Sequence, residues 1–310
     1  MVSVKLIVVF CLANSRQKQT TLFPDHSFQL HLPSAEDAHF ANWFQNSAVE
    51  QRIGEVVGRL LGAGSPYGYT RENWTFVDAG MNRGFQTLLP AELGYDVLAI
   101  EAMPTCTRQA STTFRLNNLS QNVNIVLAGI APHNSGTMAV KSDAPCNAGN
   151  TIVAAADHEA PRPNLMNRIF FASADVQVPL RSLASLLSTL KKGVAVLKMD
   201  IEGSEMAALT SFGLAAFAQH RVGHLIVEIC SHLWRHSLDH GVRFFEGLAA
   251  ISEGAYCLDP EPGCSFKTGV DKNFGMVHRI VDMKKTVVRV AGNSCCGNIW
   301  FRGIGHIVDK

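Results

Sequence analysis

The glycine-containing turn after residues 74–78 has the residue types and spacing of a ligand site. Residues 74–78 form an apolar run that ends in an acid, and four positions at and after its end suit ligand contact: Asp78, Gly80, Asn82 and Gly84. A second apolar run, residues 97–100, is followed by Glu101. In a Rossmann-like unit, such a turn brings the backbone close to a nucleoside, and the second acid accepts hydrogen bonds from ribose hydroxyls. We therefore predict a nucleoside site with Glu101 at the ribose.

The composition of this turn distinguishes between classes of nucleoside cofactor. A loop that binds a dinucleotide reads G-x-G-x-x-G, and its second glycine lets the backbone touch the pyrophosphate. Here Asn82 takes the place of that glycine, and Asp78 would repel a diphosphate but attract a cationic ammonium group. S-adenosylmethionine has an ammonium group, a ribose and no phosphate, so we predict it as the cofactor. The alternatives are an NAD-dependent Rossmann oxidoreductase and an ordinary strand-to-helix turn without a ligand.

Further acids follow the apolar run of residues 194–199. Asp200 and Glu202 come after this run, and Glu228 lies near the end of the next run, residues 224–229. Ligands of open α/β sheets bind at the carboxyl ends of strands, so these acids should face the same crevice as the glycine turn. Methyl transfer from a sulfonium to a hydroxyl needs in-line alignment and removal of the hydroxyl proton. The three acids are candidate bases, although Asp200 has two alternative roles, binding the cofactor amine and capping the next helix.

Two charged neighbours of these acids have simpler interpretations. Glu205 falls in the first turn of a predicted helix, where the helix dipole favours an acid, so we predict a capping role. Lys198 lies inside the apolar run, where a lone charge is costly to bury. We predict that Lys198 pairs with a neighbouring acid.

Three histidines follow Glu228 at four-residue spacing: His232, His236 and His240. On a helix they would share one face, as metal ligands can. No carboxylate or cysteine stands near them in a metal-binding motif, so we predict no metal and interpret them as solvated residues. His232 lies three residues beyond Ile229, which makes it a fourth candidate for the base or for contact with the acceptor.

The elements that must position these residues alternate between strand and helix patterns. The sequence predicts strands over residues 74–78, 97–101, 123–127, 194–200, 224–229, 255–258 and 299–302. It predicts helices over residues 86–93, 105–119, 183–190, 205–212 and 238–251. The strands are near-continuous apolar runs, which is typical of a parallel sheet covered on both faces. We therefore predict an α/β fold with a Rossmann-like, doubly wound, mostly parallel sheet.

The first 73 residues precede this alternation. Residues 1–15 resemble a short signal peptide, with a lysine, a short apolar run and small residues after it; the alternatives are a buried first strand and a mis-assigned start. Both the cytoplasm and the secretory pathway therefore stay open. Residues 14–35 are polar and read as a tail or linker, and residues 34–61 have a helical pattern in which Ser34 can cap with Asp37 three positions later.

Composition excludes several classes of protein. The chain has 310 residues, of which 47% are hydrophobic and 17% charged, and a net charge of +1, which indicates a globular protein without a nucleic-acid partner. No run approaches the ~18 apolar residues of a membrane span. The eight cysteines include no C-x-x-C pair, which argues against a zinc ribbon; the late cluster of four could form disulfides in an oxidising compartment: Cys257, Cys264, Cys295 and Cys296.

Two asparagines stand in glycosylation sequons. Asn73 precedes Trp74 and Thr75, and Asn118 precedes Leu119 and Ser120. Chance sequons are common, so by themselves they do not separate the two compartments.

Four segments resemble those of FkbM-type methyltransferases. They are VDAGMNRG at residues 77–84, IEAMP at 100–104, LKMDIEGSE at 197–205 and IVEI at 226–229. The D-x-E-G-x-E element is the most specific of them. The resemblance implies a class I methyltransferase fold, S-adenosylmethionine as cofactor and methylation of a hydroxyl group on a small metabolite or sugar. It covers residues 75–230 well and the remainder only loosely.

Departures from the family pattern concern the loop and the flanking segments. Met81 and Arg83 replace small and aliphatic residues, Ala102 stands where proline is usual, and residues 178–183 lack the acid of a frequent Leu-Asp pair. These changes leave the cofactor prediction intact. The resemblance implies an N-terminal extension over residues 1–73 and a methyltransferase domain over 74–303, with insertions near 131–170 and 259–296. A methyltransferase-like binding module without activity is the main alternative.

Overall fold

The computed structural model describes residues 17–23, 25–140, 145–146, 176–229, 238–258, 270–271, 277–292 and 296–305. Residues 1–15, His232, His236, and most of the two predicted insertions lie outside these ranges.

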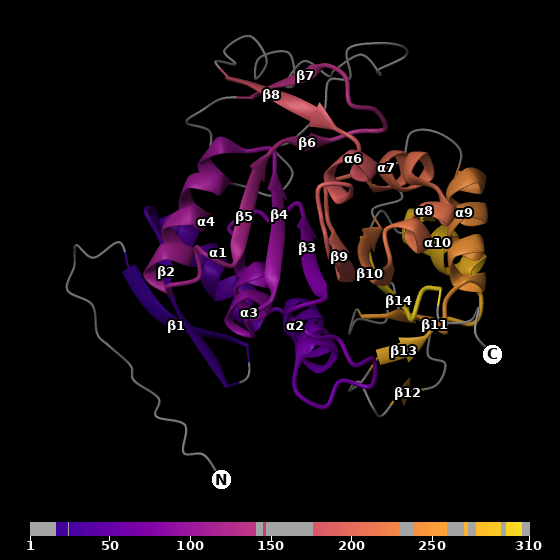
Figure 1. The fold of residues 1–310 in the computed structure, drawn as a ribbon, viewed down its shortest axis with the longest axis horizontal. Helices are drawn as coiled ribbons and strands as arrows, with labels where there is room; N and C mark the ends of the chain where they lie inside the picture. Colours follow the sequence, from indigo (N-terminus) through magenta and orange to yellow (C-terminus); the bar gives the residue numbers. More distant parts are fainter. Residues whose placement is uncertain are drawn as a thin grey trace.

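A nine-stranded sheet forms the centre of the molecule, in the order β12-β13-β11-β14-β10-β9-β3-β4-β5 (Figure 1). Its five parallel strands are β3 (Trp74–Ala79), β4 (Asp96–Glu101), β5 (Val123–Leu127), β9 (Gly193–Met199) and β10 (Val222–Ile229). The antiparallel strands on the other side are β14 (Gly297–Arg302), β11 (Gly254–Cys257), β13 (Val277–Arg279) and β12 (Val270–Asp271). The predicted mostly parallel α/β sheet is confirmed.

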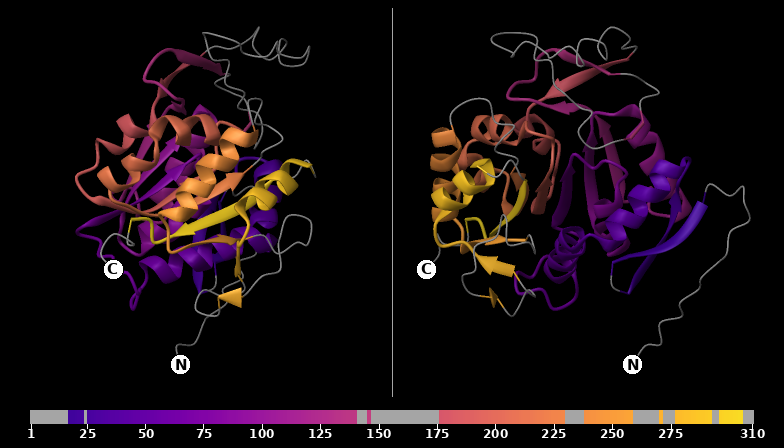
Figure 2. Two further views of the ribbon diagram at one scale, coloured as in Figure 1. Left: turned by 90° about the vertical axis from the view of Figure 1, so that its right-hand side faces the viewer. Right: turned by 180° about the vertical axis from the view of Figure 1, so that it is seen from behind.

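Helices cover both faces of this sheet (Figures 1 and 2). One face packs against α1 (Ala35–Asn46), α2 (Ala48–Leu61), α3 (Phe85–Glu92) and α4 (Pro104–Leu116). The other face packs against α6 (Leu183–Leu187), α7 (Glu205–Phe212), α8 (Leu214–Gln219), α9 (Leu238–Ala250) and α10 (Met283–Gly292). Strand residues alternate between the two cores: Phe76 and Val196 pack on the first face, and Val77 and Leu197 on the second. This two-sided burial explains the continuous apolar runs of the parallel strands.

The strand order reverses between β3 and β9, because β4 and β5 lie on one side of β3 while β9 and β10 lie on the other. Ligands of open α/β sheets bind at such a switch point, outside the carboxyl ends of the strands. The turns that leave β3 and β9 therefore meet where a ligand site is expected.

The prediction of a tail or linker over residues 14–35 is wrong for the described part. Strands β1 (Gln17–Phe23) and β2 (His26–His31) form an antiparallel hairpin whose side chains Leu22, Phe28 and Leu30 are fully or nearly fully buried. The hairpin contacts α1, α2 and α4. Alternating apolar residues drive this strand pairing, because they can bury one face of the hairpin while polar residues face water.

The predicted helix over residues 34–61 is two helices separated at Ser47. Ser34 and Asp37 form the predicted capping box at the start of α1, with reciprocal side-chain-to-backbone hydrogen bonds. Ser47 ends α1 and accepts the N–H of Glu50 as the N-cap of α2. Buried residues Ile53, Val57 and Leu60 then pack α2 on the central sheet.

A small separate sheet stands above the carboxyl edge of the main sheet in Figure 1. It contains β6 (Gly129–Ile130), β8 (Val176–Arg181) and β7 (Thr137–Val140), in that order. Strands β7 and β8 pair antiparallel and flank residues 141–175 in the sequence. No helix in the described ranges is long and apolar enough to cross a bilayer.

Candidate functional site

The turn after β3 has a backbone that only a few residue types adopt. Gly80, Asn82 and Gly84 have φ angles of 79°, 53° and 76°, in the left-handed region that favours glycine and tolerates asparagine. A Cβ on Gly80 would overlap the carbonyl oxygen of Asp200, so the turns after β3 and β9 are in backbone contact. Asp200 N–H also donates to Ala79 O at 2.9 Å. The sequence-predicted residues Gly80 and Asp200 are thus brought together.

Glu101 holds this turn from the neighbouring strand. Its Oε2 accepts the N–H of Asn82 at 2.9 Å, and its Oε1 accepts the N–H of Met103 at 2.7 Å. Burial raises the pKa of Glu101, while these backbone donors favour the ionised form and oppose the shift. Each carboxylate oxygen has two acceptor positions, so both keep capacity for a further donor such as a ribose hydroxyl.

Asp78 lies deeper than the other site residues. Its side chain is fully buried, and its Oδ2 accepts the hydroxyl of Thr87 at 2.7 Å. Its Oδ1 lies 3.5 Å from Nζ of Lys198 and accepts no hydrogen bond from the described residues. Asp78 thus joins helix α3 and strand β9 at the base of the glycine turn, and its contact with a cofactor amine stays a prediction.

Lys198 connects the two turns. Its ammonium donates to Gly80 O at 3.1 Å and lies 3.5 Å from both Asp78 Oδ1 and Asp200 Oδ2. Burial disfavours the charged ammonium, but the surrounding carboxylates outweigh burial and raise the pKa of Lys198 above its ordinary value. The prediction that Lys198 pairs with a neighbouring acid is confirmed, and it pairs with two.

The turn after β9 is held by its own acid. Glu205 is fully buried and accepts the N–H groups of Ile201 at 2.8 Å and Gly203 at 3.0 Å. Burial raises the pKa of Glu205 to about 7, against the effect of these donors. Glu202 in this turn has a φ of 55°. Its carboxylate also accepts its own backbone N–H, the first amide of α7, so Glu205 caps the helix as predicted and in addition stabilises the turn that precedes it.

The candidate bases differ in their electrostatic surroundings. Burial and the nearby carboxylates of Asp200, Glu202 and Glu205 raise the pKa of Glu228 to about 10. Asp200 is partly exposed on its side chain, yet its Oδ1 is buried and accepts no hydrogen bond from the described part of the chain. An acceptor atom in this state suits a ligand that donates a hydrogen bond. His232 lies outside the described residues.

A carboxylate from the N-terminal extension joins this charge cluster, which the sequence did not indicate. Glu50 of α2 accepts Nε2 of Gln86 at 2.7 Å, and the same nitrogen donates to Glu50 O at 3.1 Å. Burial raises the pKa of Glu50, and the charge of Lys198 opposes this shift. Glu50 stands three positions after Ser47, which matches a helix start, but no local pattern indicates its nearness to Lys198.

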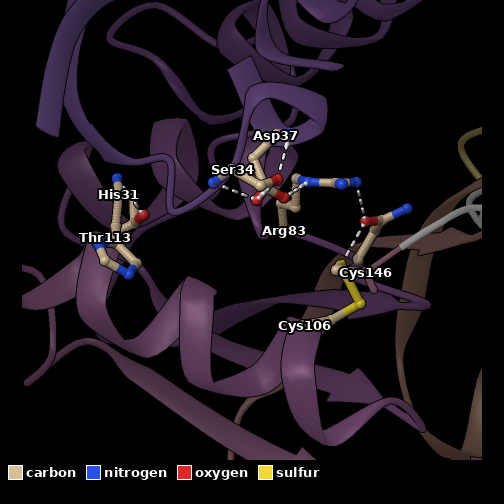
Figure 3. A network of polar contacts seen from close by, with 8 residues as sticks. His31, Ser34, Asp37, Arg83, Cys106, Thr113 and Cys146 are labelled. Carbon is tan, nitrogen blue, oxygen red and sulfur yellow. Dashed lines mark hydrogen bonds and ion pairs between the residues drawn. A yellow bond between two sulfur atoms is a disulfide. The ribbon is translucent and has the colours of Figure 1, made fainter. Parts of the chain in front are cut away.

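Arg83, a departure from the family pattern, binds the N-terminal extension (Figure 3). Its Nε lies 2.9 Å from Asp37 Oδ1, and the two side chains are 3% and 4% exposed. Its guanidinium also lies 4.2 Å from the centre of the Phe40 ring. The capping acid of α1 therefore also fixes the glycine turn, and a family member with an aliphatic residue here would lack this pair.

A disulfide reaches the other side of the glycine turn (Figure 3). Cys106 in the first turn of α4 is bonded to Cys146 across 40 residues. Cys146 Sγ lies 3.1 Å from Asn82 Oδ1, a close contact without a shared hydrogen because a disulfide sulfur carries none. The sequence analysis considered disulfides only among the four cysteines near the C-terminal end, so it did not predict this bridge. Cys296 from that cluster is also disulfide-bonded.

Within the described ranges, no group of three or more histidine, cysteine or acidic side chains has an arrangement that could hold a metal ion. Of the three histidines with four-residue spacing, only His240 lies in these ranges. The site residues placed by the structure are thus carboxylates, one lysine and backbone groups, a donor set suited to an organic ligand with ammonium and hydroxyl groups.

Several methyltransferases are among the solved structures whose backbones align, at low similarity, with this chain. The O-methyltransferase TomG from Streptomyces achromogenes, solved with SAM, has 11% identity and a TM-score of 0.38, with 81% of this chain and 78% of TomG covered. A putative O-methyltransferase from Klebsiella pneumoniae has 10% identity and a TM-score of 0.36, with 87% and 96% covered. The N-terminal domain of human METTL16, solved with SAH, has 12% identity and a TM-score of 0.33, with 82% and 70% covered. Likenesses this distant do not bear on function.

The sequence comparison is more specific. No curated protein sequence matches the chain significantly. The family model of the methyltransferase FkbM domain matches residues 78–248, which is more than half of the chain and runs from Asp78 through the turn after β9 to α9. The chain therefore belongs to the FkbM methyltransferases, and its cofactor is S-adenosylmethionine, as the composition of the glycine turn predicts.

Proposed function

We propose that this protein methylates a hydroxyl oxygen of a small metabolite or a glycan, with Asp200 or Glu202 as the base. The observation that carries the proposal is the position of Asp200, whose backbone contacts Gly80 and whose Oδ1 is buried without a hydrogen bond from the described residues. The bound cofactor supplies a methyl group on a cationic sulfur. A carboxylate beside the glycine turn is then placed to receive the proton of an acceptor hydroxyl.

The cofactor side of the proposal assigns the ribose to Glu101 and the methionine end to the glycine turn. Glu101 has acceptor capacity left after binding two backbone N–H groups. Gly80, Asn82 and Gly84 shape the turn, and Asp78 adds negative charge beneath it that favours an ammonium group. The same charge disfavours the diphosphate of NAD, which supports a methyltransferase over an oxidoreductase.

The charges of the cluster bear on the candidate bases. Burial and the neighbouring carboxylates raise the pKa of Glu228, which favours its protonated form, and a protonated carboxyl can donate a hydrogen bond. A cationic sulfur nearby would favour ionisation of these acids, because an opposite charge stabilises a carboxylate. Glu228 and His232 therefore remain candidates for the base or for contact with the acceptor oxygen.

Two experiments test the proposal, first calorimetry for cofactor binding and then an assay of methyl transfer. Titration with S-adenosylmethionine, S-adenosylhomocysteine and NAD should give binding of the first two and none of the third. Once a hydroxyl-bearing acceptor is found by screening, Asp200→Asn and Glu202→Gln should be compared with the wild type. Loss of the base should lower turnover about 10²–10⁴-fold with cofactor affinity nearly unchanged. Full turnover in both variants would assign the base elsewhere, and binding of cofactor without any turnover on hydroxyl acceptors would favour a binding module.

A further inference from the structure

The two sequons of the chain lie at the same end of the sheet, opposite the proposed active site. Asn73 directly precedes β3, and Asn118 lies between the end of α4 and the start of β5. Both positions are at the amino ends of parallel strands, whereas the glycine turn and Asp200 are at the carboxyl ends. Both asparagines are exposed. A large group on either side chain would therefore leave the carboxyl edge open.

The turn that carries Asn118 presents this side chain to solvent. Asn118 has a φ of 59°, and its N–H donates to Arg115 O at 3.2 Å as the helix ends. Leu119 is buried and anchors the turn, while Ser120 is exposed. Within the sequon, Asn118 and Ser120 are therefore exposed and Leu119 between them is buried, so the asparagine amide and the serine hydroxyl are both accessible.

The neighbouring asparagine is used differently. Asn117 Oδ1 accepts the N–H of Gln29 at 2.9 Å, and Asn117 Nδ2 donates to Gln29 O at 2.8 Å. These bonds tie α4 to the N-terminal hairpin, so Asn117 has a structural role. The Asn118 side chain makes no hydrogen bond to a described residue, so its amide has no structural role within the described part of the chain.

The sequon at Asn73 differs from that at Asn118 in one respect. Its third residue, Thr75, is 2% exposed inside β3, and Asn73 Nδ2 donates weakly to Thr70 Oγ1 at 3.4 Å. Modification at Asn73 would need the chain before β3 folds, whereas the Asn118 sequon stays accessible in the folded protein.

The disulfides indicate the compartment in which a sequon is used. Cys106, at the opposite end of the helix that leads to Asn118, is bonded to Cys146, and Cys296 is bonded as well. Disulfides persist in oxidising compartments and are rare in the cytosol. N-linked glycans are added in the same secretory compartment. The disulfides therefore place the chain in a compartment where its exposed sequon can be glycosylated.

We propose that Asn118 carries an N-linked glycan. In this transfer, Nδ2 of Asn118 bonds to the anomeric carbon of an oligosaccharide, the bond from that carbon to a lipid diphosphate breaks, and the amide gives up one proton. The donor is a lipid-linked oligosaccharide of the secretory pathway. The proposal is independent of the methyl acceptor and of which acid is the base.

The full-length chain made in the secretory pathway of cultured eukaryotic cells tests the proposal. Asn73→Gln removes the other sequon, so any remaining N-glycan is on Asn118. This variant should lose mass when treated with peptide N-glycosidase F, the loss should disappear with an added Ser120→Ala, and Ser120→Thr, which keeps the sequon, should retain it. Release of the glycan in H₂¹⁸O should label Asn118 of the wild type as aspartate, which needs no variant.

The contrary results are equally definite. Absence of an enzyme-sensitive mass in the Asn73→Gln chain, with no ¹⁸O label on Asn118 of the wild type, would overturn the proposal. Free thiols at Cys106 and Cys146 in peptides from the secreted wild type would remove the argument from compartment and count against it as well.

Discussion

The two turns at the carboxyl edge are built alike but held from different places. Each contains a non-glycine residue in the left-handed region, Asn82 after β3 and Glu202 after β9. Each is fixed by a buried glutamate that accepts two backbone N–H groups. Glu205 lies within a few residues of both amides it binds, whereas Glu101 binds Met103 beside it and reaches Asn82, in the glycine turn, from the adjacent strand. The turn after β9 is therefore a local structure, and the glycine turn depends on tertiary contacts.

The external contacts of the glycine turn extend that difference. Asp37 binds Arg83 from the N-terminal extension, and Cys146 contacts Asn82 from the other side. The turn after β9 contacts the rest of the site through Lys198 and through the backbone of Asp200, which donates to Ala79 O. Changes far from the proposed base should therefore reach cofactor binding through the glycine turn and leave the turn after β9 intact.

The largest expected effect comes from breaking the Arg83–Asp37 pair. Asp37→Ala leaves a buried guanidinium without its carboxylate and should lower the free energy of unfolding by about 3–5 kcal/mol. Urea unfolding measures this loss. Amide hydrogen exchange should quicken at Asn82 but not at Gly203. The double variant Asp37→Leu with Arg83→Met, which removes both charges, should recover part of the loss; equal exchange at both turns in Asp37→Ala would contradict the comparison.

Removal of the Cys106–Cys146 bridge should have the next largest effect. Cys106→Ser opens a loop that spans 40 residues and should lower stability by about 2–4 kcal/mol, because the unfolded chain gains freedom. It should also weaken binding of S-adenosylmethionine, since Asn82 loses its contact with Cys146. Reductant should lower the cofactor affinity of the wild type at least to that of the variant, because it also opens the bridge of Cys296. Unchanged cofactor affinity in both would show that the glycine turn is held without the bridge.

The turn after β9 should respond to pH through Glu205. Its pKa is about 7 in the fold and 4.5 in the unfolded chain, so the folded state binds the extra proton between these values. The resulting stabilisation is full below pH 4.5 and is lost as the pH rises through 7. Between pH 4.5 and 8, wild type should therefore lose up to about 3 kcal/mol relative to Glu205→Gln. If the free energy of unfolding changed with pH by the same amount in both proteins, the raised pKa would not belong to Glu205.

The smallest effect is expected at Glu101. Glu101→Ala removes the acceptor for the Asn82 and Met103 amides and for the proposed ribose hydroxyls, and should weaken cofactor binding by about 1–3 kcal/mol. Isothermal titration measures the change, with Glu205→Gln as the matched variant of the other turn. Cofactor affinity should fall in the first and hold in the second. The comparison fails if the two variants bind the cofactor equally.

The strands of the sheet could be predicted because burial on both faces requires near-continuous runs of apolar residues, which are visible in the sequence. The predicted strand at 123–127 matches β5, and the predicted helix at 205–212 matches α7. Helix ends were less accurate: residues 105–119 and 183–190 were predicted, and α4 and α6 end at Leu116 and Leu187. The candidate acids were found because the carboxyl ends of parallel strands always meet at one edge.

What the sequence could not indicate depends on contacts between distant residues. The hairpin of β1 and β2 was missed because polar residues dominate its strands and only a few buried apolar residues alternate with them. Three interactions join residues that are tens of residues or more apart. They are the ion pair of Asp37 and Arg83, the disulfide of Cys106 and Cys146, and the effect of the Lys198 charge on Glu50. Ion pairs and disulfides of this kind have no periodicity, so only the folded chain identifies them.

The packing of α2 has a consequence for how the protein can be divided. The family match begins at Asp78, yet the face of the sheet formed by Phe76 and Val196 is covered by α2, which lies entirely before that point. A chain shortened to residues 78–248 would lack most of β3 and all of α2, would expose Val196 to water and would leave Arg83 without Asp37. The segment matched by the family model is thus smaller than the packed core, and we expect the extension to belong to the folding unit.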